Sequence, residues 1–203
     1  MKRCVIIGGG EIADVPFIKQ HILNDDFVTC CDGGYLHAFR EGITPSLIVG
    51  DFDSADVPQT DIETIVLPCE KDDTDSFFAA KEGLKRGFDS FLLLGVTGGR
   101  LDHTLGAISI LEFLQNAGAT GEIIDKSTRI RVCSDTLSVK NGCKYFSVFA
   151  IGCAKGVTIS GAKYNLDNAI INSHYQYGIS NEVAGDFATV SVGQGTVIVM
   201  EIF

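Results

Sequence analysis

Four short apolar runs in the first half of the chain are each followed by a loop with acidic or glycine residues. The runs cover residues 28–30, 47–49, 64–67 and 91–94. The loops after them contain Asp32; Asp51 and Asp53; Asp72, Asp73 and Asp75; and Gly98, Gly99, Arg100, Asp102 and His103. Helical segments alternate with the runs, so the pattern predicts parallel strands whose carboxyl ends share one edge of a sheet. Open α/β sheets bind ligands at that edge, and we expect one site there.

The pattern changes near residue 126. Residues 1–125 alternate apolar runs with helical segments, whereas residues 126–203 contain strand candidates separated by glycine turns. This predicts an N-terminal Rossmann-like α/β domain with a mostly parallel sheet and a C-terminal antiparallel β-sandwich domain. The strand candidates of the second region are residues 129–133, 144–149, 157–160, 188–192 and 196–202.

Two predicted helices begin directly after acidic loops. The first starts near residues 73–75 and ends before Gly87, which suits a C-terminal cap. The second starts near residues 101–102 and ends at Gly118. Acidic residues also stabilise the first turn of a helix, which is the alternative to a ligand role for Asp73 and Asp75.

Composition narrows the classes of function. The net charge is −10 and the pI is about 4.7, which argues against nucleic-acid binding because that needs a basic surface. No apolar run approaches the roughly 20 residues of a membrane span. The seven cysteines form no Cys-x-x-Cys pair, so we expect reduced core residues of a cytoplasmic protein.

The paired carboxylates predict a magnesium site. Asp51 and Asp53 flank Phe52, so in an extended segment both acids point to the same side. Asp72 and Asp75 are three residues apart and share a face at a helix start. Mg²⁺ takes one or two carboxylates together with phosphates and waters. A solvated turn and helix capping are the structural alternatives.

The Gly98–Gly99–Arg100 loop predicts phosphate binding. Bare glycine backbone and a helix N-terminus can approach phosphate, and a guanidinium binds phosphate with two parallel hydrogen bonds. Asp102 and His103 would then be a metal ligand and a nucleotide contact, or else only an N-cap and a first-turn residue. A surface role for Arg100 is the alternative.

The spacing around Gly8–Gly10 favours a competing function, that of an NAD-linked oxidoreductase. The segment follows the first apolar run in a G-x-G-x-x-A pattern, and Asp32 stands where a dinucleotide-binding protein keeps its ribose-binding acid. No helical pattern follows at once, Pro16 interrupts early, and the later carboxylates stay unexplained. A tight strand-to-loop turn is the structural alternative.

The order of these segments resembles the thiamine pyrophosphokinases (thiamin diphosphokinases), and the similarity continues through residues 161–166 and 178–182. The resemblance implies an enzyme that transfers diphosphate from ATP to the thiamine hydroxyl with Mg²⁺, giving thiamine diphosphate and AMP. It also implies a homodimer with sites shared between subunits. Thiamine would bind between the α/β domain of one subunit and the β domain of the other.

Residue roles carried over by position fall into four groups. The metal-binding residues would be Asp51, Asp53, Asp72, Asp75 and Asp102. ATP would contact Asp32, Lys71, Thr74, Gly98, Gly99, Arg100 and His103. Thiamine would contact Tyr164, Ser180 and Asn181. Catalysis would depend on Asp75, Asp102 and Arg100, and either aspartate could accept the hydroxyl proton.

Two departures from the family pattern affect the expected pocket rather than the acids. Ser46 stands where an acid is common, and Ala162 replaces a usual leucine. The alternative functions are a pyrophosphokinase acting on another hydroxymethyl heterocycle such as a pterin, a nucleotide pyrophosphatase, and a non-catalytic nucleotide sensor. Residues 178–182 favour thiamine over these.

Overall fold

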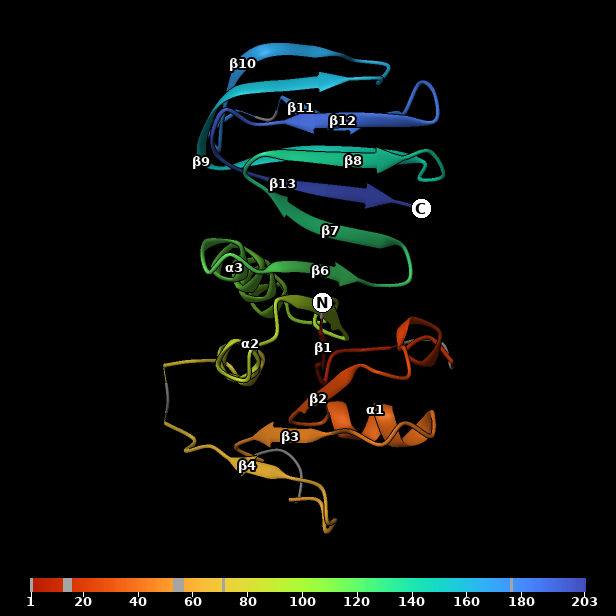
Figure 1. The fold of residues 1–203 in the computed structure, drawn as a ribbon, viewed down its shortest axis with the longest axis vertical. Helices are drawn as coiled ribbons and strands as arrows, with labels where there is room; N and C mark the ends of the chain where they lie inside the picture. The colour runs from red at the N-terminus through yellow and green to blue at the C-terminus, as the bar shows by residue number, and fades with distance from the viewer. Residues whose placement is uncertain (1, 13–15, 53–56, 71, 176) are drawn as a thin grey trace. The chain divides into compact units, whose positions relative to one another are not determined.

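The computed structural model describes residues 2–12, 16–52, 57–70, 72–175 and 177–203 (Figure 1). It contains two compact units, Met1–Lys126 and Ser127–Phe203, which are described separately below as unit 1 and unit 2. No helix in the described part is long and apolar enough to cross a membrane.

Unit 1 is built on a parallel sheet. Its strands are β1 (Arg3–Ile7), β2 (Phe27–Cys31), β3 (Leu47–Gly50), β4 (Thr64–Val66), β5 (Ser90–Leu94) and β6 (Thr120–Ile124). They lie in the order β4-β3-β2-β1-β5-β6, and all five neighbouring pairs are parallel. The chain runs outward from β1 to β4 and then returns to β5, so the order reverses between β1 and β5. Such a switch point is where open α/β sheets bind ligands.

The helical elements of unit 1 are η1 (Lys19–His21), α1 (Gly34–Arg40), α2 (Asp75–Lys85) and α3 (Leu101–Asn116). Sequence signals for the last two were accurate. Gly87 follows α2 with φ +86°, and its N–H donates to Leu84 O at 2.9 Å. Gly118 has φ +79° beyond α3. Both glycines adopt the left-handed conformation that ends helices.

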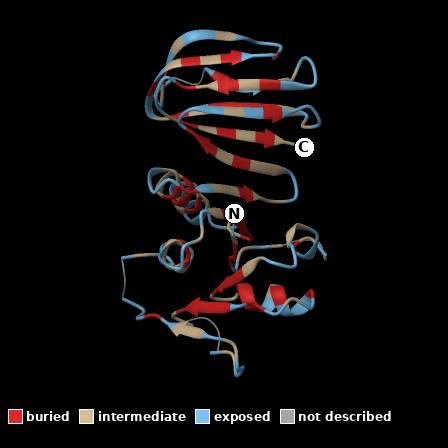
Figure 2. Cartoon of the chain, viewed as in Figure 1, coloured by how far each residue is buried: buried red, intermediate tan, exposed pale blue. Residues whose placement is uncertain are grey.

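The central strands of unit 1 are buried on both faces (Figure 2). Strands β1, β3 and β5 show no alternation of buried and exposed residues, and Val5, Ile48 and Leu92 are at most 1% exposed. One apolar cluster joins β1, β2, β3 and β5 to Tyr35 and Ala38 of α1. Near-continuous apolar runs are what a parallel sheet covered on both faces requires.

Unit 2 is antiparallel throughout its paired strands. They are β7 (Thr128–Cys133), β8 (Thr136–Lys140), β9 (Tyr145–Ser160), β10 (Leu166–Asn172), β11 (Gly178–Asn181), β12 (Phe187–Ser191) and β13 (Gln194–Ile202). The first half of β9 pairs with β13 and β11, and its second half pairs with β10 and β12. Side chains from both halves, including Phe146, Val148, Val157 and Ile159, enter one core cluster.

The long strand β9 corrects one expectation. Residues 144–149 and 157–160 were expected to be separate strands, but they are the two ends of β9. Gly152 and Gly156 lie between them with φ +68° and +66°. These glycines bend the strand without ending it, because glycine adopts positive φ at low cost.

Candidate active site

The carboxyl ends of β2 and β3 bring two of the expected acids together. Asp32 follows β2, and its N–H donates to Val49 O of β3 at 2.8 Å. A Cβ added to Gly50 would lie 3.1 Å from the Cα of Asp32, so the two strand ends touch. Asp51 follows Gly50 directly and is half-buried. Asp32 has φ +43° and a buried Oδ1 atom, a strained arrangement of the kind found at functional sites.

Asp75 reaches the same edge from the first turn of α2. The next residue, Ser76, hydrogen-bonds the Cys31 thiol at the end of β2. Burial raises the pKa of that thiol well above its ordinary value, and the nearby Asp75 carboxylate raises it further. Oδ1 of Asp75 is buried as well. The start of α2 therefore places Asp75 beside the strand that ends at Asp32.

The other residues of the loop before α2 have identifiable contacts. Thr74 is the N-cap, and its Oγ1 accepts the Phe77 N–H at 3.2 Å. Asp73 pairs with Lys81 at 2.7 Å, which gives Asp73 a local structural role. Asp72 is exposed. Two further expected site residues, Asp53 and Lys71, lie outside the described part of the chain.

The described acids suit a metal ion that arrives with phosphate. Within the residues the structure describes, no group of three His, Cys, Asp or Glu side chains forms a ready-made metal site. Mg²⁺ seldom uses an all-protein cage and takes one or two carboxylates plus phosphate oxygens and water. Asp51 and Asp75 carry carboxylate oxygens, the hard donors that it prefers, and could hold such an ion.

The loop after β5 holds the expected phosphate-binding residues. Gly98 and Gly99 have φ +83° and +58°, and no atom lies within 4 Å of a Cβ added at either position. Arg100 donates from Nε and Nη2 to the two carboxylate oxygens of Asp102, at 3.2 and 2.6 Å. The N–H of His103 donates to Asp102 Oδ1 at 3.0 Å. The structure thus brings all five residues into one exposed loop and helix start.

The Arg100–Asp102 pair couples two residues that were expected to act separately. The hydrogen bond from Arg100 is the main reason that the pKa of Asp102 falls to about 2. Both side chains are exposed, at 72% and 65%, so the pair is weak and can be exchanged for another partner. A phosphate group would compete with Asp102 for the same guanidinium.

The Gly8–Gly10 segment is explained by packing. The N–H groups of Gly8 and Gly10 donate to Leu94 O and Gly95 O, each at 2.8 Å. A Cβ at Gly10 would lie only 2.6 Å from Gly95 O, so the two backbones need glycine to approach. In the described residues between β1 and β2 the only helical element is the three-residue η1. This arrangement lacks the long helix of a dinucleotide-binding turn.

In unit 2, Asn181 ties two segments together. Its side chain is buried, and its Oδ1 accepts the N–H groups of Tyr164 and Glu182 at 3.0 and 2.9 Å. Its Nδ2 donates to Tyr164 O at 2.7 Å. The Lys163 N–H donates to Glu182 O beside them, and Lys163 Nζ pairs with the Glu182 carboxylate at 2.7 Å. These three hydrogen bonds of the Asn181 side chain therefore all go to backbone groups.

Ser180, next to Asn181, has a different environment. It is exposed, has φ +58°, and donates its N–H to the buried Ser147 Oγ at 3.1 Å. Tyr164 presents its side chain to solvent and is 61% exposed. Ser180 and Tyr164 are thus the outward-facing members of the expected thiamine group. Sequence reasoning missed Ser147, which no motif marks, because its role depends on the pairing of β11 with β9.

Unit 1 is a parallel α/β unit with acids and a glycine–arginine loop at the edge where such sheets bind ligands, and an antiparallel β unit follows it in the chain. This is the class of two-unit α/β proteins with a ligand-binding sheet edge. The family model "Thiamin pyrophosphokinase, catalytic domain" matches residues 18–120. The model "Thiamin pyrophosphokinase, vitamin B1 binding domain" matches residues 134–197. The chain belongs to the thiamin pyrophosphokinase family.

Individual relatives agree over nearly the whole length. Thiamine pyrophosphokinase of Bacillus subtilis is 28% identical over 210 residues, with 98% of each chain covered. A crystal structure of the Bacillus subtilis enzyme has a TM-score of 0.90 at 25% identity and covers 99% of both chains. Thiamin pyrophosphokinase from Geobacillus thermodenitrificans has a TM-score of 0.86 at 27% identity and covers 99% of this chain and 97% of its own.

Proposed function

We propose that this chain transfers the terminal diphosphate of ATP to the hydroxyl of thiamine at the carboxyl edge of the unit 1 sheet. The products are thiamine diphosphate and AMP, which is the known activity of the thiamin pyrophosphokinase family. The observation that carries the proposal is the position of Asp32, Asp51 and Asp75. These acids lie at the ends of β2 and β3 and at the start of α2, on the edge where such sheets bind ligands.

The reaction needs positioning and charge neutralisation more than covalent chemistry. The thiamine hydroxyl oxygen forms a bond to the β-phosphorus, and the bond from that phosphorus to the α,β-bridging oxygen breaks, so AMP leaves with the bridging oxygen. Arg100 would exchange Asp102 for phosphate oxygens and hold them with its planar fork. The open backbone at Gly98 and Gly99 would allow phosphate to approach the loop.

Of the two candidate bases, we favour Asp75 as the acceptor of the hydroxyl proton. Asp102 is exposed, and it is engaged by Arg100 in an ion pair. Asp75 has a buried oxygen and lies beside the strand that ends at Asp32. When bound, Mg²⁺ would neutralise charge on the transferring phosphates, held by Asp51, Asp75 and the expected ligands Asp53, Asp72 and Asp102.

The thiamine contacts would come from Tyr164 and Ser180. Both face solvent, and the aromatic ring of Tyr164 offers an apolar surface for a heterocycle. Asn181 would help by fixing the backbone of Tyr164, since its oxygen and nitrogen bond that backbone on both sides. Asp32, Lys71, Thr74 and His103 would complete the nucleotide side of the site.

We further propose that unit 2 is a β-sandwich and that the enzyme is a homodimer. Val197 and Val199 of β13 are fully buried in the unit 2 core, so the alternating residues Ile198 and Met200 face the opposite side of the sheet. That side is apolar and half-buried, and Ile198 is paired with Phe149. A sheet face exposed to water normally alternates to polar residues, so an apolar second face favours a covering copy of the chain.

A mixing experiment tests the shared site that the family resemblance implies. Inactive Asp75→Asn protein is mixed with inactive Ser180→Tyr protein under conditions in which subunit exchange is demonstrated by a mass-tagged copy. The proposal predicts partial recovery of activity, because a mixed dimer regains one intact site. Demonstrated exchange without recovery would refute sharing, and a fully active monomer would refute the dimer.

We infer a cytoplasmic location from the chemistry of the chain. All seven cysteines lie in the described part, and all are free thiols. Free thiols, several of them buried, suit a reducing compartment where ATP is also present.

The central assay uses purified protein with ATP, Mg²⁺ and thiamine, and follows AMP and thiamine diphosphate. The proposal predicts AMP only when thiamine is present. AMP without thiamine would indicate a pyrophosphatase, and no AMP with retained ATP binding would indicate a sensor. A hydroxymethyl pterin replacing thiamine as the better acceptor would indicate the related pyrophosphokinase.

A further inference from the structure

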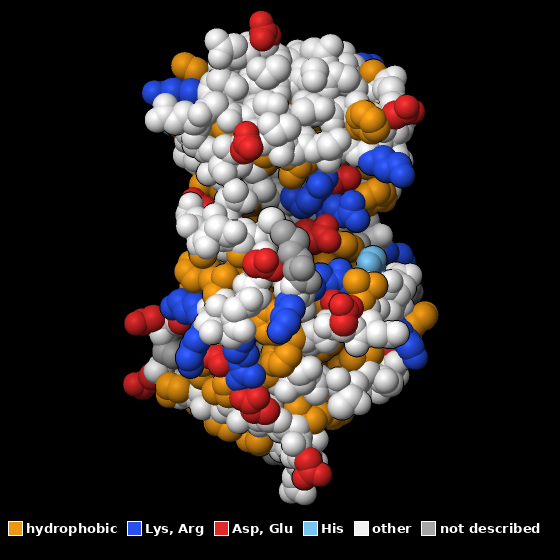
Figure 3. Space-filling view, in the orientation of Figure 1, with side chains coloured by type: hydrophobic (Ala, Val, Ile, Leu, Met, Phe, Trp, Pro, Cys, Tyr) orange, Lys and Arg blue, Asp and Glu red, His pale blue; other side chains and the backbone are white. Residues whose placement is uncertain are grey.

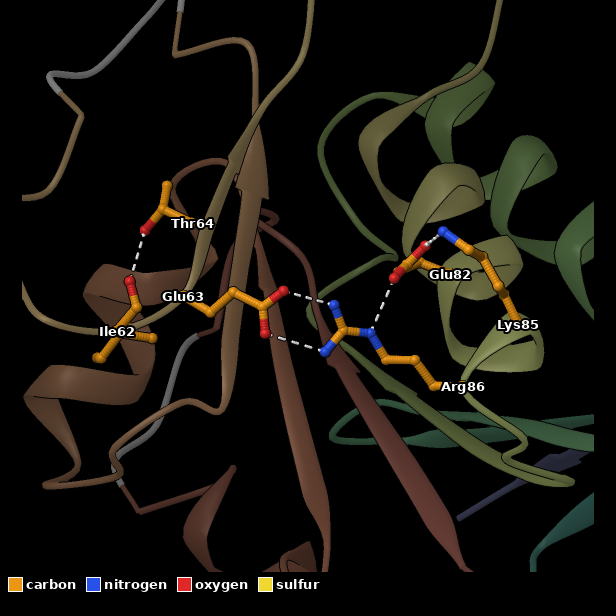
Figure 4. A network of polar contacts seen from close by, with 6 residues as sticks. All are labelled: Ile62, Glu63, Thr64, Glu82, Lys85 and Arg86. Carbon is orange, nitrogen blue, oxygen red and sulfur yellow. Dashed lines mark hydrogen bonds and ion pairs between the residues drawn. The ribbon is translucent and has the colours of Figure 1, made fainter.

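Arg86 is the centre of an ion-pair network at the end of α2 that the residue assignments above leave unused (Figure 4). Its Nη1 and Nη2 donate to the two carboxylate oxygens of Glu63 at 3.0 and 2.6 Å. Its Nε donates to Glu82 at 2.9 Å, and the guanidinium lies 5.4 Å from the ring centre of Phe27. Figure 3 shows basic and acidic side chains side by side over α2.

Glu63 immediately precedes β4, an edge strand whose Ile65 packs against the small apolar cluster of Leu47, Val49 and Leu67. Strand β4 has three residues, lies at the edge of the sheet and pairs with β3 alone among the described strands. Its last residue, Val66, is 59% exposed. Short edge strands with little buried surface are weakly fixed in register, and a shift of one residue turns every side chain to the other face.

The pairing of β4 determines what lies beside the acidic edge. At the start of the strand, the Ile48 N–H donates to Glu63 O at 2.9 Å. At its end, the Leu67 N–H donates to Gly50 O at 2.8 Å, immediately before Asp51. The register of β4 against β3 therefore sets the position of Leu67, from which the chain continues toward the start of α2.

The surroundings of the Arg86 guanidinium favour its two-bonded contact with Glu63. The Arg86 side chain is only 26% exposed, because Glu82 and Phe27 cover it. Hydrogen bonding from Arg86 lowers the pKa of Glu63, so the pair stays ionised at neutral pH. A bidentate arginine–carboxylate pair fixes direction as well as distance, which a single lysine charge does not.

A second contact holds the other end of the same segment to the same helix. Lys81 of α2 pairs with Asp73 at 2.7 and 2.9 Å, just before the helix begins. Helix α2 thus holds the chain before β4 through Arg86 and after it through Lys81. Asp72 directly precedes Asp73, and Asp75 is the first residue of α2, so both acids lie close in sequence to the contact between Asp73 and Lys81.

We propose that Arg86 is a positioning residue: through Glu63 it fixes the register of β4 and so sets the acidic segment at residues 67–75 for the metal–nucleotide complex. The inference rests on the proposed function for the identity of that complex. Arg86 acts from the opposite end of the strand and touches no substrate.

Two substitutions test the role, with a matched control. Arg86→Lys keeps the charge and loses the fork, and Glu63→Gln keeps the size and loses the carboxylate. Lys85→Gln is the control, because Lys85 is the neighbouring cation, also pairs with Glu82 and is 79% exposed. For each protein, Mn²⁺ affinity in the presence of ATP is measured by electron paramagnetic resonance, and amide hydrogen exchange is measured on the metal-free chain.

We expect Arg86→Lys and Glu63→Gln each to weaken Mn²⁺ binding by about fivefold and to speed exchange in residues 64–75 by about tenfold. The double variant should be no worse than either single variant, because both remove one interaction. Exchange in β5 and the KM for thiamine should stay at wild-type values, and Lys85→Gln should change nothing.

Unchanged Mn²⁺ affinity in both single variants would overturn the inference, even if the thermal midpoint fell, because the pair would then serve stability alone. Additive effects in the double variant would also overturn it. If wild-type protein made no thiamine-dependent AMP, the proposed function would fail, whereas the Mn²⁺ and exchange measurements would still decide the role of Arg86.

Discussion

The acidic edge of unit 1, formed by Asp32, Asp51 and Asp75, differs from the Asn181 corner of unit 2, where Asn181 meets Tyr164 and Glu182. The difference lies in how their polar groups are satisfied. At the corner, the buried Asn181 side chain bonds backbone groups of Tyr164 and Glu182, so its polar atoms are satisfied within the unit. At the edge, Asp32 and Asp51 follow β2 and β3 and Asp75 begins α2, so an incoming cation would meet carboxylates from three elements. The corner is therefore complete before a ligand binds, whereas at the edge the proposed Mg²⁺ would supply the counter-charge.

The largest effect that the comparison predicts is on the edge. Asp75→Asn, nearly isosteric but uncharged, should lower turnover by about 100-fold or more with little change in stability, because a metal-binding charge and the proposed base are lost together. Steady-state kinetics and thermal unfolding measure the two quantities. The matched control is Asp89→Asn, the same change in an exposed residue before β5, which should stay at wild-type turnover. Near wild-type turnover in Asp75→Asn would remove Asp75 from the site.

At the Asn181 corner we expect the opposite, namely that substitution mainly lowers stability. Asn181→Ala leaves two backbone N–H groups without their acceptor, and we expect a loss of about 2 kcal/mol in the free energy of unfolding. Urea unfolding followed by circular dichroism measures it. Ser180→Gly is the contrasting variant, because it relieves a positive φ and should keep or slightly raise stability while thiamine binding weakens. An Asn181→Ala protein of wild-type stability would contradict the assigned role.

Arg100→Lys should have an intermediate effect that is confined to the nucleotide. The planar fork is lost, and we expect the KM for ATP to rise by about tenfold with the KM for thiamine unchanged. Stability should hardly change, because the Arg100–Asp102 pair is exposed. A rise in the KM for thiamine alone would move the loop at residues 98–103 away from the phosphates.

The smallest effect concerns protonation of Asp102. Its folded pKa, about 2, lies below the ordinary value of 3.8, so the ion pair is present above that value and is lost as pH falls through about 2. Asp102 should therefore not titrate at neutral pH, and it should cause no inflection in activity there. Arg100→Gln should return the carboxyl titration midpoint toward 3.8, as followed by NMR. An unchanged midpoint would contradict the pairing.

The sequence was informative where local patterns fix structure. The apolar runs before Asp32, Asp51 and Gly98 are parallel strands, as predicted. They could be recognised in the sequence because strands buried on both faces are continuously apolar. Gly118 ends its helix as expected, since positive φ is a local requirement. The family could also be predicted, because its motifs lie in order along the chain.

Roles that depend on distant pairing were not visible in the sequence. Arg86 and Glu63 are far apart in the chain, and no spacing rule joins them. Asn181 was expected to contact thiamine, and only the fold reveals that its side chain bonds the backbone of Tyr164. Strand β10 was missed because its exposed residues and the bulge at Asn168, φ +45°, hide the alternation.

The most direct test of the central claim follows the bridging oxygen of ATP. ATP that carries ¹⁸O between the α- and β-phosphorus atoms is incubated with the enzyme, Mg²⁺ and thiamine, and both products are examined by mass spectrometry. Attack of the thiamine hydroxyl on the β-phosphorus predicts the label in AMP, an unlabelled thiamine diphosphate, and no AMP when thiamine is left out. Label in the diphosphate product, or labelled AMP that forms without thiamine, would contradict the account.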